Sequence, residues 1–215
     1  RYPDTVAARP VDPEDDEPAG FLVSPGQYTV SLSKRVRGQT TELVSAKPFM
    51  VERLRDGALP PQADAAEFWA EISAFDRSVT ATDMTLKQVQ KRIELMDVAV
   101  ARAAGGDPAA LDNRLQAIRA EAQALDAMLN GNQARNALFE RTQPTVRSRL
   151  GAIMTGLFGA TYGPTQTHRD QFGYAQAEFE GIRDRLKTLS EATIPAFETE
   201  LQAAGAPWVP GGALP

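Results

Sequence analysis

Residues 68–100 read FWAEISAFDRSVTATDMTLKQVQKRIELMDVAV, and the spacing of the apolar side chains in this stretch decides the fold. The apolar positions alternate at steps of four and three residues, and only Thr82 puts a polar side chain in the series. Such steps place every member on one face of an α-helix, as in the heptad seam of a coiled coil. The pattern predicts one helix from Asp64 to the glycines at 105 and 106, about 40 residues and roughly 60 Å long. The seam consists of Phe68, Ile72, Phe75, Val79, Leu86, Val89, Ile93, Met96 and Val100.

Three further segments show the same spacing and are predicted to be helices. The second covers residues 107–130, opened by Asp-Pro and closed by Asn-Gly. The third covers 144–157 and the fourth 164–205. The fold class is therefore mainly α, and residues 64–205 are expected to form an antiparallel four-helix bundle with two long and two shorter helices. The stretch between the second and third helices is ambiguous, and its apolar pair at 138–139 is expected to tuck under the bundle.

The apolar spacing of the fourth predicted helix shifts by one residue between Leu189 and Ile194. Pro195 lies at this shift, and a proline inside a helix lacks the N–H that would bond the carbonyl four residues earlier, here that of Glu191. We therefore predict that the helix is kinked at Pro195.

Strict up-and-down alternation of the four helices predicts where the bundle meets the segment before it. All four helices would lie together at the Gly105 end, and only the first and fourth would reach the other end. The residues predicted to meet at that junction are Phe68, Trp69, Ile194, Pro195, Phe197 and Trp208. Packing between domains is the favoured interpretation of this aromatic group, and a ligand site is the alternative.

A β-hairpin is predicted before the bundle. Tyr28, Val30 and Leu32 alternate with polar residues, as in a strand with one apolar face. A return strand follows the tip at Gly38, and near Pro48 it is expected to bulge or to lie at an edge. Because a lone hairpin is only marginally stable in water, we interpret it as the remnant of an Ig-like or fibronectin-like β-sandwich whose other strands precede this chain.

The sequence divides into four parts. Residues 1–55 hold an acidic, proline-rich loop and the hairpin, residues 56–63 a linker, 64–205 the bundle and 206–215 a C-terminal tail. The acidic run at 12–17 is interpreted as a solvated loop, with a calcium site as the alternative. The basic hairpin tip is interpreted as a solvated edge, with an anion contact as the alternative.

Composition and motifs exclude several classes of function. The 215 residues carry a net charge of −5, which argues against general nucleic-acid binding, and no apolar run is long enough to span a membrane. With no cysteine and one histidine, the usual zinc sites are excluded, and we expect His168 to lie on a helix surface or to cap a helix. No catalytic residue, cofactor or metal site is predicted, and no small-molecule ligand is expected.

Four short motifs, in their order along the chain, resemble the C-terminal region of bacterial sortilin-like, glycosyl-hydrolase-type propeller proteins with Asp-box repeats. The four lie within Arg1–Pro3, Ser24–Leu32, Gly163–Thr165 and Ile194–Gly205. The acidic run at 12–17 and Glu198, where that family often has Asn, depart from the pattern. The Asp-box pattern Ser-x-Asp-x-Gly-x-x-Trp does not occur in the sequence, so the resemblance transfers no catalytic residue. It implies that a propeller lies upstream and that the protein is exported, to the periplasm or the outside.

Three hypotheses about function follow. One of them, an enzyme with a site at the junction of the hairpin and the helices, requires a deep polar pocket with convergent ionisable groups, which the sequence does not indicate. The first is a non-catalytic C-terminal accessory domain of a larger exported propeller protein, which itself resembles glycosyl hydrolases; its partner would be the chain's own propeller. The chain begins at Arg1 rather than Met, which agrees with a piece of a longer protein. The alternative is an independent helical-bundle module that binds another protein through an exposed helix pair.

Overall fold

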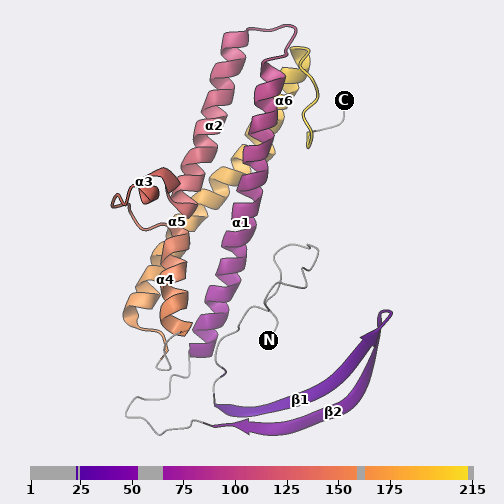
Figure 1. Cartoon of the computed structure of the whole chain (residues 1–215), viewed down its shortest axis with the longest axis vertical. Coiled ribbons are helices and arrows are strands. Elements are labelled where there is room, and N and C mark those ends of the chain that lie inside the picture. The colour runs from indigo at the N-terminus through magenta and orange to yellow at the C-terminus, as the bar shows by residue number, and fades with distance from the viewer. Residues whose placement is uncertain (1–22, 24, 53–64, 159–162, 213–215) are drawn as a thin grey trace.

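The computed structural model describes residue 23 and residues 25–52, 65–158 and 163–212. The fold class is confirmed: the chain is mainly helical, with two long and two shorter helices after an antiparallel hairpin (Figure 1). The acidic run at 12–17 and the linker at 56–63 lie outside the described residues. The elements are β1 (Gly26–Val36), β2 (Gln39–Val51), α1 (Ala65–Val100), α2 (Pro108–Asn130), α3 (Gln133–Ala137), α4 (Val146–Phe158), α5 (Gln166–Thr188), the π-helical turn η1 (Leu189–Thr193) and α6 (Ile194–Ala203).

The two shorter helices follow one another along the two long ones. At the end of α2, Asn130 donates to Asp83 of α1 at 2.8 Å, and Arg147 in the first turn of α4 reaches the same carboxylate at 3.4 Å. The far end of α4 brings Gly156 against His168 at the start of α5. Thus α2 and α4 run in the same direction, antiparallel to α1 and to the continuous α5–η1–α6 helix (Figure 1).

This arrangement corrects the expected alternation of the helices. The chain between α2 and α4 returns to the level at which α2 ended, so α4 continues away from the Gly105 end instead of running back toward it. Each level of the bundle therefore holds α1, the last helix and either α2 or α4. The physical reason is that α3 and its flanking turns replace the tight reversal that strict alternation requires.

The predicted seams form the hydrophobic core. Leu86 of α1 is 1% exposed and Leu186 of α5 is 4% exposed. The apolar residues spaced by three and four in the second predicted helix are all buried: Leu111, Leu115, Ile118, Ala122, Leu125 and Leu129. Edge-to-face contacts join Phe75 to Phe172 and Phe179, with ring centroids 5.5 and 5.1 Å apart. The expectation that the pair at 138–139 tucks under the bundle is wrong: Leu138 is 71% exposed and Phe139 95%.

A π-helical turn accounts for the shift of spacing before Pro195. The N–H of Ile194 donates to the carbonyl of Leu189, five residues earlier rather than four. A turn of this kind inserts one residue into an α-helix, so Leu189, Ile194 and Leu201 all remain buried although their spacing changes. The prediction that a proline kink absorbs the shift is therefore wrong, because η1 absorbs it and Pro195 lies in the first turn of α6.

We expect the π-turn and Pro195 to depend on each other. Deleting Ala192 should restore regular spacing of the buried residues, but it would press the proline ring against the carbonyl four residues earlier and destabilise the fold by about 3 kcal/mol. The same deletion combined with Pro195→Ala should recover most of that loss. Urea unfolding of both variants measures the difference, and equal stabilities would show that the proline does not require the π-turn.

Candidate functional site

The residues predicted to meet at one junction lie at opposite ends of the bundle. Phe68 and Trp69 lie in the first turns of α1, where the Phe68 ring packs edge-to-face on Phe172 with ring centroids 5.6 Å apart. Ile194, Pro195, Phe197 and Trp208 belong to the Gly105 end, where the N–H of Gly105 donates to Ala204 at 2.9 Å. The predicted junction is wrong because α5–η1–α6 runs parallel to α1, so its end meets the end of α1 and not its beginning.

A buried ion pair holds the Gly105 end together. Arg92 of α1 donates two hydrogen bonds to the Glu198 carboxylate of α6, with N–O distances of 2.6 and 2.5 Å. Glu198 is only 7% exposed. Part of the predicted tail packs over this pair: Val209 is buried, Gly211 lies against Arg92, and Gly212 lies so close to Glu198 that an added Cβ would be about 3.0 Å from its carboxylate. The tail thus belongs to the packed body through residue 212.

A second polar cluster joins the end of α2 and the start of α4 to the middle of α1. Asn130 donates to Asp83 and Asp126 and accepts a bond from Arg147 at 2.8 Å, while Lys87 bonds Asp83 at 2.7 Å. Burial raises the pKa of Asp83, but the hydrogen bonds from Lys87 and Asn130 and the charges of Lys87 and Arg147 together hold the pKa below its usual value. The donors and acceptors of the cluster satisfy one another, so its role is structural: it links α1, α2 and α4.

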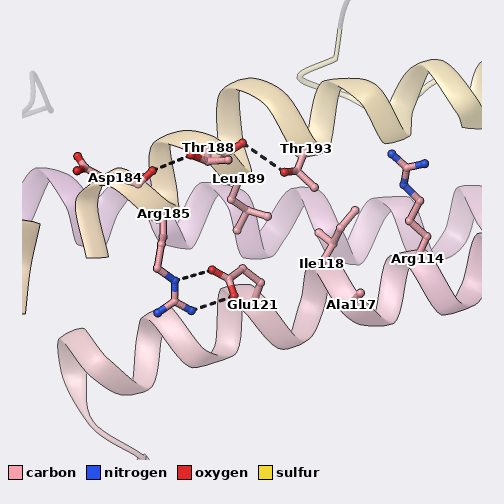
Figure 2. A pocket seen from close by; sticks show the side chains of 9 residues that line it. All are labelled: Arg114, Ala117, Ile118, Glu121, Asp184, Arg185, Thr188, Leu189 and Thr193. Carbon is pink, nitrogen blue, oxygen red and sulfur yellow. Dashed lines mark hydrogen bonds and ion pairs between the residues drawn. The ribbon is translucent and has the colours of Figure 1, made fainter. Parts of the chain in front are cut away.

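A groove of about 450 Å³ lies between α2 and the helix turns around η1 (Figure 2). Ala117, Ile118 and Leu189 supply apolar side chains to its wall. Hydroxyl groups of Thr188 and Thr193 donate back to carbonyls of their own helix, at 3.0 and 3.4 Å, and so take part in the widened backbone of the π-turn. The remaining lining residues are charged: Arg114, Glu121, Asp184 and Arg185.

The charged groups of the groove are engaged in ion pairs, one of them within the groove and the others with residues beside it. Arg185 donates to both oxygens of Glu121 at 2.8 and 2.9 Å, and Arg114 pairs with Glu200 at 2.6 Å. The hydrogen bonds from Arg185 lower the pKa of Glu121 despite its partial burial, and those to Glu121 raise the pKa of Arg185. Both groups stay more than a third exposed, so the pair contributes little to stability. The groove therefore presents an apolar strip flanked by ion pairs. Its lining residues do not include a nucleophile with a base beside it.

One face of the hairpin is mostly apolar, with Lys47 opposite Val30, and the described part of the chain leaves this face largely exposed. Tyr28 and Phe49 are cross-strand partners with ring centroids 5.9 Å apart, and Leu32 is paired with Val44. Val30, Leu32, Val44 and Phe49 are 57%, 55%, 42% and 48% exposed. Apolar side chains gathered on one face of a two-stranded sheet normally pack on a further layer. This surface is the principal candidate interaction site.

Pro48 lies within β2 and is paired with Thr29 in the ladder, so the strand continues through it. The register irregularities occur elsewhere, between Val30 and Ser33 of β1. The tip is a two-residue turn, with Arg37 at φ 51° and Gly38 at φ 83°, a conformation that favours glycine and suits a tight hairpin. At Pro48 the strand lies at an edge of the two-stranded sheet, as one of the two expectations had it, and the extra residue at Ser45–Ala46 places a bulge close by on the side toward the tip.

His168 caps α5, as predicted. Thr165 accepts a bond from the N–H of His168, and the Nδ1 atom of His168 accepts one from the N–H of Thr165, each at 3.3 Å. Within the residues described, no group of three or more His, Cys, Asp or Glu side chains is placed to hold a metal ion. None of the described helices is long and apolar enough to cross a membrane.

The fold and its surfaces define a class of protein: a helical bundle preceded by an amphipathic β-hairpin. Comparison of the chain with protein-family models, with curated proteins and with solved structures finds no match.

Proposed function

We propose that this chain is a non-catalytic accessory domain of a larger polypeptide and that its hairpin completes a β-sandwich formed mainly by other strands. The observation that supports this is the exposed apolar face of β1 and β2. An isolated hairpin with such a face is marginal in water, whereas three or more strands or a covering layer stabilise it. The helical bundle, by contrast, has its own continuous core.

The nature of the parent protein rests on the sequence resemblance. We propose an exported bacterial protein of the sortilin-like, Asp-box propeller type, resembling glycosyl hydrolases, in the periplasm or outside the cell. In that setting the bundle braces the propeller or mediates its assembly. What supports this assignment is the order of the four motifs, which includes the β1 strand and the end of α6.

We expect the purified chain to hydrolyse no aryl-glycoside. The reason is that, of the two carboxylates lining the groove, Asp184 lies on an exposed helix face and the partly buried Glu121 is bonded to Arg185. A chromogenic assay with a panel of aryl-glycosides, run beside the variants Glu121→Gln and Asp184→Asn, measures this. Turnover that persists through purification and disappears in either variant would contradict a non-catalytic role.

The alternative is an independent module that binds another protein. The observation in its favour is the exposed pair Leu138 and Phe139 beside α3, with Phe139 held at φ 54°, a conformation that non-glycine residues rarely adopt. Together with the groove at η1, this pair gives the bundle apolar surface outside the hairpin. Association that rises with protein concentration and is lost on replacing Leu138 and Phe139 by serine would favour this reading.

A further inference from the structure

The two strands of the hairpin present very different outer edges. Both register irregularities place the additional residues on β2: Ser45 and Ala46 stand against one residue of β1, and Leu43 has no counterpart. The same strand contains Pro48, which has no N–H to donate. Bulges, prolines and charges are the means by which sheet edges are protected from pairing.

The first part of β1 has none of these features. Residues 26–33 contain no proline and no charged side chain. At both register irregularities the extra residue belongs to β2, so β1 itself has no inserted residue. Val36 and Gln39 flank the two-residue turn and form a hydrogen-bonded pair, so the N–H of Val36 points toward β2. Because N–H directions alternate along a strand, the even-numbered residues of β1 point their N–H groups toward β2 and the odd-numbered residues point theirs away from it. Over residues 26–33 these are Gln27, Thr29, Ser31 and Ser33.

The size of the apolar face shows what kind of partner it fits. β1 has 11 residues; at about 3.3 Å per residue and about 4.8 Å per strand, the two-stranded face measures roughly 350 Å². A stable complex between separate molecules buries about 800 Å² on each partner. The face is well below that size, whereas a strand in the same polypeptide has a high effective concentration and needs no such area.

We propose that the outer edge of β1, over residues 26–33, is the edge along which a further strand of the same polypeptide joins the hairpin, while the opposing sheet of the β-sandwich covers Val30, Leu32, Val44 and Phe49. The outer edge of β2 is a closed edge of the finished sheet. This inference rests on the accessory function proposed above and adds to it the side on which the domain is completed.

The test is residue-resolved amide hydrogen exchange of the 215-residue chain alone and of the longer polypeptide that includes its preceding domain. We expect the amides of Gln27, Thr29, Ser31 and Ser33 to be protected at least tenfold more strongly in the longer polypeptide. The outward amides of β2 should exchange equally fast in both. Thr29→Pro in the longer polypeptide should abolish the protection of Gln27 and Ser31, and the matched control Pro48→Thr, which adds an N–H to the other edge, should leave it unchanged.

The outcomes separate the two proposals. Protection of the outward β2 amides, alone or together with those of β1, overturns the edge assignment and leaves the accessory function standing. No gain of protection on either strand overturns both. If Thr29→Pro disrupts the hairpin itself, the comparison of the two unsubstituted proteins still decides the question.

Discussion

Leu86→Asp and Leu186→Asp should each unfold the bundle or lower its stability by several kcal/mol. Leu86 is 1% exposed and Leu186 4%, and both belong to the continuous core. A carboxylate at either position would be buried without a partner, at a cost on the order of 4 kcal/mol, a large part of the 5–15 kcal/mol that stabilises a typical domain. Thermal and urea unfolding followed by circular dichroism would measure the loss.

Gln88→Asp provides the control for these substitutions. It introduces the same charge two residues from Leu86, at an exposed position of α1, and should change the stability by less than about 0.5 kcal/mol. Melting curves that Leu86→Asp leaves in place would mean that the α1 seam does not face the core.

Glu198→Ala should destabilise the protein far more than Glu200→Ala, although the two glutamates lie two residues apart on α6. Glu198 pairs with Arg92 with side-chain exposures of 8% and 22%, whereas the Arg114–Glu200 pair is 46% and 38% exposed. Removing one partner of a buried pair leaves the other charge uncompensated, at about 3 kcal/mol, and an exposed pair contributes about 0–1 kcal/mol.

The double variant Arg92→Leu/Glu198→Leu tests the cause of that loss. If the penalty comes from an unpaired buried charge, replacing both partners by apolar side chains should restore much of the stability. Free energies of unfolding from urea titrations at neutral pH give the comparison. Equal losses for Glu198→Ala and Glu200→Ala would show that burial of the Arg92 pair is energetically unimportant.

The sequence specifies the buried faces of the helices well because helix geometry alone determines which positions share a face. The seam containing Leu86 and Leu186 could be predicted for this reason. The five-residue step from Leu189 to Ile194 was visible too, but both a kink and a π-turn satisfy it, and only the Ile194–Leu189 hydrogen bond distinguishes them. The groove lined by Thr188, Leu189 and Thr193 lies beside this turn, and the spacing of apolar residues does not predict it.

Long-range arrangement is the part that the local pattern does not determine. The direction of α4 depends on how the chain between α2 and α4 packs, and Asn130 and Arg147 gave no sign in sequence of their shared contact with Asp83. Arg92 and Glu198 are 106 positions apart, and each was indistinguishable from an ordinary helical surface charge. The predicted junction was wrong for the same reason, since it depended entirely on strict alternation.

The parallel course of α1 and the last helix gives the bundle the properties of a spacer. The 36 residues of α1 extend about 54 Å, and the segment that packs over Arg92 and Glu198 lies near the far end of that helix. Anything attached through the first turn of α1 is therefore held several nanometres from Trp208 and its neighbours. Because α5–η1–α6 runs parallel to α1 and packs along the same bundle, the bundle can bend only if both long helices bend together. Matched changes in the length of α1 and of the helices packed along it would alter the reach of the domain while keeping the contacts at its two ends.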